Sequence, residues 1–319
     1  MPLQFRVGEV PRTKPFQFAD LAELLILTRL NSQVSKADLD GLIRAATEDS
    51  DPDFDGIVAD QLDEQLAHDR NAEDCFQQLL FRVGALDEHY PFLVRDALLT
   101  GCERISQLGC VYLFLLVCSR LGSFTGRAGF AQECARQFTE LSAVALGAAL
   151  NGSASVYVFD AGSADRANHF HTDLRKALRA LAVKLNALAI DDLVDQQSTS
   201  GDGGIDLVAI NSPGDPARGV LAYFGQCAAQ QNGWPRKTLE SVKAKAFFSM
   251  GHGAANLLYT PVMYRNSNGR WVNDLHSHDC VIMDRLRTLR ALKALGDNVP
   301  ERLFENVQQL VREAASAEL

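Results

Sequence analysis

Two apolar stretches separated by a turn-rich segment constrain the fold of this chain more than any other feature. The first, Ile205–Ile210, follows a glycine-rich loop and contains Asp206 as its one charged residue. The second, Val220–Cys227, contains Gln226 near its end. Residues 211–219 between them are rich in Pro, Gly, Asn and Asp, which predicts a β-hairpin. A carboxylate and a carboxamide on buried strands are costly unless each has a partner.

The register of this hairpin decides whether the two polar side chains meet. If the strands pair symmetrically about Pro216, Asp206 lies directly opposite Gln226, with Cβ atoms about 5 Å apart. Two oxygens at that spacing can bind one hard cation, and Mg²⁺ prefers carboxylates together with water and phosphate oxygens. Gly203 and Gly204, just before the first strand, would let a substrate backbone approach closely. We therefore predict a metal site that faces a substrate at this hairpin.

Glu140 is a third candidate ligand. It is the only charged residue in the run Phe138–Leu150, which forms the second half of a helix predicted over residues 132–150. A carboxylate among small and apolar residues is costly if it is buried and unpaired, so it must reach solvent, a cation or a metal. Glu140 is therefore either a surface glutamate of an amphipathic helix or a further ligand of the hairpin site.

The pattern of apolar residues predicts two domains of different class. A glycine-bearing break at residues 122–126 marks the boundary. Upstream, helical spacing of apolar residues predicts an all-helical domain over residues 1–124. Downstream, strands alternate with helices, which predicts an α/β domain over residues 125–319. Its other predicted elements are strands at Ser155–Asp160 and Leu257–Tyr264 and helices at residues 168–189, Asp279–Leu295 and Glu301–Ala314.

The net charge of −9 lies entirely in the N-terminal part. Residues 1–125 contain 20 Asp and Glu against 11 Lys and Arg, whereas the remainder has 20 of each. Overall acidity argues against general affinity for nucleic acid, but a local basic groove in the second part is compatible with it. The acidic cluster over residues 48–63 is either a solvated loop or a surface for a basic protein partner.

Cysteine spacing and apolar run length indicate the compartment. Seven cysteines have no C-x-x-C spacing and are typical of reduced, buried thiols in a cytosolic protein. The N-terminus has no apolar segment of the signal-peptide type. The longest apolar run, Leu108–Cys118, is far shorter than the roughly 20 residues that a membrane span needs. We expect a cytoplasmic protein with no membrane contact.

A helix glutamate (Glu140), the sequence Gly201-Asp-Gly-Gly-Ile-Asp206 and a strand ending in Gln226 together resemble the PD-(D/E)XK nuclease superfamily, in particular its Mrr-like restriction endonuclease branch. The resemblance covers about residues 130–265. It implies a restriction-endonuclease-like mixed sheet flanked by helices, and Mg²⁺- or Mn²⁺-dependent endonucleolytic cleavage of DNA in a restriction or phage-defence system. Matched by position, Glu140, Asp206 and Gln226 are implied to hold the metal. A homodimer is also implied by the resemblance.

One position departs from that pattern. The branch has a lysine two residues after the glutamine, where it positions the attacking water, and this chain has Ala228 there. The nearest lysine that follows is Lys237, which is either a functional replacement or a surface lysine at a helix start. Beside it, Trp234 either joins the core or stacks on a base, and Arg236 is a candidate contact to DNA. If Lys237 does not reach the metal, the chain is instead a catalytically silent nuclease-fold subunit that binds or assembles within a defence complex.

Overall fold

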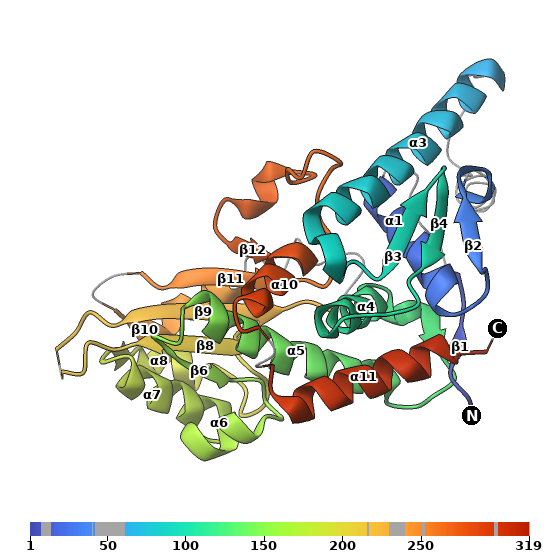
Figure 1. The fold of residues 1–319 in the computed structure, drawn as a ribbon. Coiled ribbons are helices and arrows are strands. Elements are labelled where there is room, and N and C mark those ends of the chain that lie inside the picture. The colour runs from blue at the N-terminus through green and yellow to red at the C-terminus, as the bar shows by residue number, and fades with distance from the viewer. Residues whose placement is uncertain are drawn as a thin grey trace. The chain divides into compact units, whose positions relative to one another are not determined.

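The chain divides into two compact units, which are described separately. A computed structural model describes residues 1–7, 14–39, 41, 61–215, 217–229, 240–250, 253–296 and 299–318 (Figure 1). The first unit comprises Met1–Gln132, Val262–Val272 and Phe304–Leu319, and the second comprises Glu133–Pro261 and Asn273–Leu303. The predicted boundary at residue 124 precedes the observed division after Gln132. The C-terminal segment, which we expected in the second domain, belongs to the first unit.

A five-stranded mixed sheet forms the centre of the second unit, with strand order β12-β11-β9-β8-β6. Strands β6, β8 and β9 are consecutive antiparallel neighbours, whereas β11 runs parallel to both β9 and β12. The prediction of an α/β unit with a mixed sheet is confirmed. The strands of the sheet are β6 Ser155–Val158, β8 Leu207–Asn211, β9 Leu221–Cys227, β11 Ala255–Tyr259 and β12 Val281–Met283.

The β8–β9 hairpin has the register that its sequence predicts. Val208 pairs with Phe224, and the last pair before the sheet end is Leu207 with Gly225. Both pairs are symmetrical about residue 216, as predicted. The register does not continue to Asp206, because its N–H donates to the Gly225 carbonyl, so that Asp206 and Leu207 both lie opposite Gly225, as in a β-bulge. The predicted pairing of Asp206 with Gln226 is therefore not part of the strand ladder.

Helices cover the sheet of the second unit on both faces (Figure 1). On one face, apolar side chains of α7 pack with Val208 and Phe224 in a single core. On the other, the thiol of Cys227 bonds to Ser142 and Thr139 of α5. The helices and short strands of this unit are α5 Phe130–Ala149, α6 Ala164–His169, α7 Leu174–Lys184, β7 Leu188–Ala189, α8 Asp191–Asp195, α9 Glu240–Ala244, β10 Phe248–Ser249 and α10 Arg285–Lys293.

Helix α7 is shorter than the predicted helix over residues 168–189, and its sequence shows why. Asp173 is extended and accepts a hydrogen bond from the Lys176 N–H (3.1 Å), so the helix begins after this N-cap. At the other end, Asn186 adopts a left-handed conformation (φ 48°) that terminates the helix. The apolar residues Leu174, Leu178 and Leu181 are all buried, as their spacing predicts.

The first unit is not all-helical, so this part of the prediction is wrong. It contains a three-stranded antiparallel sheet, β2-β4-β3, and a strand pair, β1-β5. The segment after Tyr90, which we expected to be helical, forms the β3–β4 hairpin instead. Asp96 and Ala97 in its turn both have positive φ (49° and 60°), as a two-residue type I′ turn requires. The strands are β1 Gln4–Phe5, β2 Gln33–Ser35, β3 Phe92–Arg95, β4 Leu98–Gly101 and β5 Phe124–Thr125.

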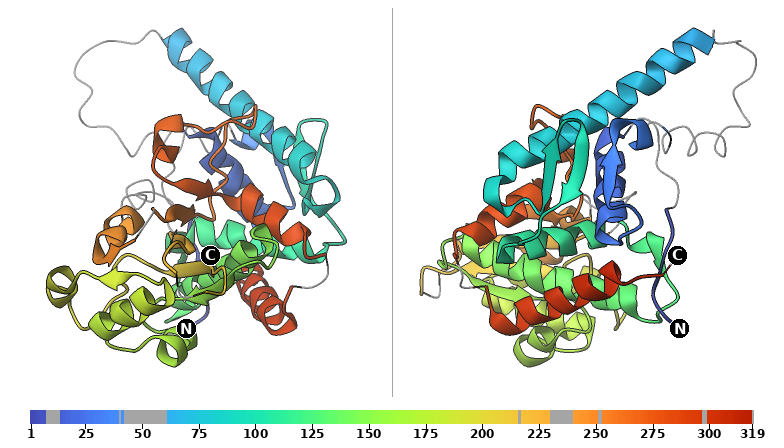
Figure 2. Two further views of the ribbon diagram at one scale, coloured as in Figure 1. Left: turned by 90° about the vertical axis from the view of Figure 1, so that its left-hand side faces the viewer. Right: turned by 45° about the vertical axis from the view of Figure 1, so that its right-hand side comes forward.

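Helices α1 and α3 of the first unit contact each other, and β3 of the hairpin contacts α3 (Figure 2). Ser35 and Asp38 form a reciprocal capping pair: the Ser35 hydroxyl accepts from the Asp38 N–H (3.1 Å), and Asp38 accepts from the Ser35 N–H (2.8 Å). Their three-residue spacing in the sequence is the signature of such a helix start. The continuation beyond residue 41 and the acidic residues 48–60 lie outside the described residues. The helices are α1 Pro15–Leu27, α3 Gln61–Leu86, α4 Gln107–Ser119 and α11 Glu301–Ala315.

A fully buried ionic network lies in the first unit. The Arg82 guanidinium, at 0 % side-chain exposure, is 2.8 Å from Asp20 Oδ1 and 2.8 Å from Glu23 Oε1. The hydroxyls of Tyr90 (2.6 Å) and Tyr112 (2.7 Å) also donate to the Glu23 carboxylate. The Asp20 and Glu23 carboxylates therefore both have a charged partner, which offsets the cost of removing them from water. Among the described residues, no helix has the length and apolar character needed to cross a membrane.

Candidate metal site at the end of the hairpin

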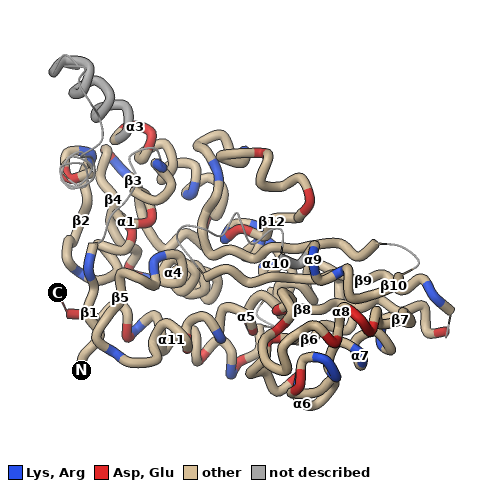
Figure 3. The backbone as a smooth tube through the Cα atoms, turned by 180° about the vertical axis from the view of Figure 1, so that it is seen from behind, with Lys and Arg blue, Asp and Glu red and all other residues tan. Residues whose placement is uncertain are grey.

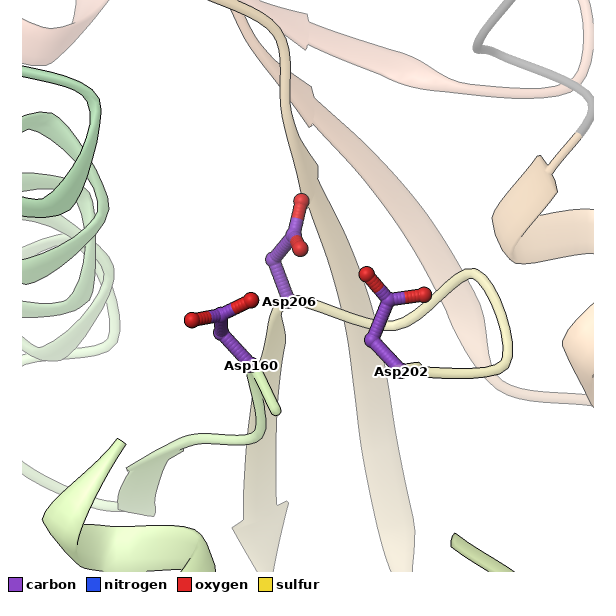
Figure 4. Close-up of side chains that lie close together, drawn as sticks. All are labelled: Asp160, Asp202 and Asp206. Atoms are coloured by element: carbon purple, nitrogen blue, oxygen red, sulfur yellow. The ribbon is translucent and has the colours of Figure 1, made fainter. Parts of the chain in front are cut away.

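Three aspartates converge where strand β8 begins. One carboxylate oxygen from each of Asp160, Asp202 and Asp206 lies within 4.8 Å of the other two. Figure 4 shows the three side chains turned toward one another: Asp160 follows β6, Asp202 lies in the glycine-rich loop, and Asp206 precedes β8. Carboxylate oxygens at this spacing are the donors that hard divalent cations such as Mg²⁺ and Mn²⁺ prefer.

Backbone hydrogen bonds hold Asp206 in place from both neighbouring strands. Its N–H donates to the Gly225 carbonyl (2.9 Å), and its own carbonyl accepts from the Phe159 N–H (2.7 Å). Its Oδ2 accepts a short hydrogen bond (2.6 Å) from the Cys227 N–H. The side chain is only 8 % exposed. The hydrogen bond to the Cys227 N–H therefore fixes the orientation of the Asp206 carboxylate at the end of β9.

The glycine-rich loop brings Asp202 to the same place. Gly201, Gly203 and Gly204 all have positive φ (94°, 67° and 82°), a conformation that other residues adopt only with strain. Asp202 stabilises the turn by accepting from the Gly204 N–H (2.7 Å). The glycines therefore have a conformational reason to be present. The close approach of a substrate to Gly203 and Gly204 stays a prediction.

Gln226 supplies an independent reason to expect a ligand here. Its side chain is 3 % exposed, and its Oε1 has no hydrogen-bond partner in the part of the chain that the structure describes. A buried carboxamide oxygen left in this state costs about 1–3 kcal/mol. Gln226 directly precedes Cys227, whose N–H bonds to the Asp206 carboxylate, so a cation bound at the aspartates is a candidate partner for this oxygen. The three carboxylates are themselves donors that fit Mg²⁺ or Mn²⁺.

Glu140 lies apart from this cluster. Its carboxylate is 39 % exposed and pairs with Arg136 one turn earlier in α5 (2.8 Å). The neighbouring residues Thr139 and Ser142 do reach the thiol of Cys227, so α5 passes close to the end of β9. Of the two alternatives for Glu140, the structure has it as a surface glutamate with a cationic partner.

The pairing of Glu140 gives a testable expectation. Glu140→Gln should change Mn²⁺ affinity by less than about threefold, because an exposed ion pair with Arg136 contributes at most about 1 kcal/mol. The affinity is measured from the signal of free Mn²⁺ in electron paramagnetic resonance. A loss of Mn²⁺ binding in Glu140→Gln would contradict this expectation. It would show that Glu140 is a metal ligand and that its ion pair with Arg136 breaks when the metal binds.

Three predicted site residues, Trp234, Arg236 and Lys237, lie outside the described residues. Ala228, at the position of the expected lysine, is 1 % exposed and donates its N–H to the Tyr259 carbonyl (2.9 Å). Sequence reasoning missed Asp160 as a site residue and did not single out Asp202. Asp160 has one available signal: it is the last residue of the predicted strand Ser155–Asp160, and site residues commonly lie where a strand passes into a loop.

Both acidic and basic side chains lie around the candidate site, and they shift the pKa values of buried neighbours. Burial raises the pKa of the Cys227 thiol well above its ordinary value, and the Asp206 carboxylate adds to this effect. Burial lowers the pKa of the Arg166 guanidinium, which Asp202 and Asp160 oppose. Figure 3 shows acidic and basic positions interspersed along α6, α7 and α8. Part of the basic charge of α7 is neutralised locally, since Arg179 pairs with two aspartates of α8 at 2.9 Å each.

Comparison of the chain with protein-family models, curated proteins and solved structures finds no match. The geometry of the site therefore carries the functional argument. The observations that bear on it are the convergent aspartates, the mixed sheet whose strands lead to them, and the Gln226 oxygen, which has no partner among the described residues.

Proposed function

We propose that this chain is a Mg²⁺- or Mn²⁺-dependent DNA endonuclease of a restriction or phage-defence system. The observation that supports this most is the meeting of Asp160, Asp202 and Asp206. The buried Gln226 oxygen, which has no hydrogen-bond partner among the described residues, adds to it. The resemblance of the glycine–aspartate motif and Gln226 to Mrr-like nucleases points to phosphodiester hydrolysis. A mixed sheet flanked by helices is the architecture that this resemblance implies.

The proposed roles follow from the donor set. Asp160, Asp202 and Asp206 would hold the metal, and the Gln226 oxygen would complete its protein ligands. Mg²⁺ or Mn²⁺, when bound, would supply orientation of a water molecule and stabilisation of negative charge on the scissile phosphate. Lys237 would position the attacking water, the role of the branch lysine whose place in this chain is taken by Ala228.

Other parts of the proposal concern partners. Trp234 and Arg236 contact DNA. The acidic N-terminal residues bind a basic protein of the same defence system. The nuclease acts in the cytoplasm, and a homodimer places two such sites on the two strands of a duplex.

A second candidate function is favoured by Ala228. This residue is buried and its backbone is engaged with Tyr259, so the strand has no lysine at the position where the chemistry of the branch uses one. A chain of this kind would bind a metal and DNA without cutting. It would then serve as a silent nuclease-fold subunit of a defence complex.

The decisive experiment separates metal binding from cleavage. Purified protein is incubated with supercoiled plasmid in Mg²⁺, Mn²⁺ or EDTA, and Mn²⁺ binding is measured in parallel by electron paramagnetic resonance. Under the first proposal, nicked and linear products form with metal and disappear in EDTA. Mn²⁺ binding without any cleavage of plasmid, linear duplex or single-stranded DNA supports the silent subunit. Absence of Mn²⁺ binding contradicts both, because both use the aspartate cluster.

A further inference from the structure

Arg166 is a fully buried arginine that donates its hydrogen bonds to backbone carbonyls. It lies on α6 at 0 % exposure, and its guanidinium also stacks over the ring of Phe159 at 5.1 Å from the centroid. The carbonyl groups that accept from it belong to four residues in three separate segments of the second unit: Phe159, His171, Thr172 and Gly201. A planar group with five donors can bridge segments in this way, whereas an ammonium group cannot.

Two of these carbonyls directly precede the aspartates of the candidate site. Arg166 Nη1 donates both to Phe159, the residue before Asp160, and to Gly201, the residue before Asp202. One nitrogen atom therefore links the backbones that carry two of the three carboxylates. Both carboxylates also attract the guanidinium charge. The Asp202 loop lies outside the sheet, so strand pairing alone does not fix the separation of Asp160 from Asp202.

Hydrogen bonds connect the start of helix α6, which carries Arg166, to strand β6. Ser163 caps α6 by accepting from the Arg166 N–H (3.1 Å), and the same hydroxyl donates to the Val158 carbonyl (2.6 Å). Asp165 accepts from the Val158 N–H (3.0 Å). Because Val158 pairs with Leu207 of β8, the anchor of Arg166 is fixed relative to Asp206 as well.

We propose that Arg166 is a positioning residue that sets the geometry of the cation site by holding the Asp160 and Asp202 backbones together. This inference rests on the proposed metal site, but it does not require that the chain cleave DNA. Arg166 does not touch the metal. It fixes the separation of two ligands, and cation affinity depends on that separation.

Arg166→Lys tests the inference, because lysine keeps the charge and loses the planar set of donors. We expect the dissociation constant for Mn²⁺ to rise about 30-fold, within the range found when support of a metal ligand is removed. The matched control is Arg175→Lys. Arg175 donates to Gln197 in the same loop (2.7 Å), but its bonded carbonyl does not adjoin a site aspartate, so Mn²⁺ affinity should stay near that of the wild type.

Melting temperatures in EDTA and in saturating Mn²⁺ separate positioning from general stability. A residue with a purely structural role lowers both melting temperatures and leaves the metal-induced increase intact. Loss of positioning diminishes the metal-induced increase itself. Wild-type Mn²⁺ affinity in Arg166→Lys, whatever its melting temperature in EDTA, would overturn the inference.

Gly201→Ala tests the same link from the other end and keeps the inference open to refutation if Arg166→Lys fails to fold. Gly201 is exposed, has φ 94° and has open space for a Cβ, so alanine strains the carbonyl that Arg166 holds without entering the core. We expect at least tenfold weaker Mn²⁺ binding. Gly214→Ala is the control: Gly214 has φ 85° and open space in the distant turn of the hairpin. Equal affinity of both variants would contradict the inference.

The failure of this inference is distinguishable from that of the proposed function. If wild-type protein binds no Mn²⁺, the aspartate cluster is not a metal site and both proposals fall. If Asp206→Asn abolishes Mn²⁺ binding while Arg166→Lys and Gly201→Ala retain it, the metal site stands and only the role of Arg166 is overturned.

Discussion

Asp206→Asn should lower metal-dependent DNA cleavage by about 10³-fold, the loss typical of removing one strong electrostatic contribution from an active site. The reason is local. Asparagine has the shape of aspartate, and its Oδ1 can still accept from the Cys227 N–H, so the end of β9 is preserved. What disappears is the negative charge that faces Asp160 and Asp202. Initial rates of plasmid nicking at saturating Mg²⁺ measure the effect, and unchanged circular dichroism shows that the fold is intact.

Two companion variants locate the effect. Asp160→Asn should act in the same direction as Asp206→Asn, because its carboxylate belongs to the same cluster. Asp215→Asn makes the same chemical change in the exposed turn of the same hairpin, where the carboxylate accepts from the Ala217 N–H (2.8 Å), and the nicking rate should be unaffected. Undiminished cleavage by purified Asp206→Asn protein would exclude this cluster as the active site.

The hairpin was predictable from sequence because its determinants are local. Turn-forming residues between two apolar stretches fix the register about residue 216, and this register brings Asp206 to the end of β9, where it bonds to Gly225 and Cys227. Asp160 was not predictable in the same way. It joins the site because β6 pairs antiparallel with β8, and that pairing connects segments far apart in the chain. Helices α6, α7 and α8 and the short strand β7 lie between β6 and β8 in the chain, so no local sequence pattern indicates this pairing.

The errors in the first unit have a related origin. A two-residue hairpin turn is usually recognised in a sequence by glycine or asparagine, and the turn Asp96-Ala97 contains neither. The β3–β4 hairpin therefore resembled part of a helical region. Similarly, Asp20, Glu23 and Arg82 are residue types that usually lie on the surface, and α3, which contains Arg82, carries many other charged residues, so the sequence did not suggest their burial. Their partners come from different helices and are brought together only by packing.

Arg82→Met should destabilise the first unit by about 3–5 kcal/mol, because it leaves two carboxylates buried without their cation. Methionine fills a similar volume, so the loss of charge dominates over the cavity. Burial would lower the pKa of Arg82, but Glu23 and Asp20 outweigh this and raise it well above its ordinary value. Urea denaturation followed by hydrogen exchange of amides in α1, α3 and α4 measures the change within the first unit.

Lys36→Met is the matched control for burial. Lys36 and Glu73 form an ion pair of similar length (2.6 Å), but the two side chains are 43 % and 49 % exposed. Its removal should cost less than about 1 kcal/mol, because solvent screens both charges. The two substitutions delete the same kind of interaction, so the difference between them isolates desolvation. Equal costs would show that the hydroxyls of Tyr90, Tyr112 and Ser119, which also donate to these carboxylates, satisfy them without Arg82.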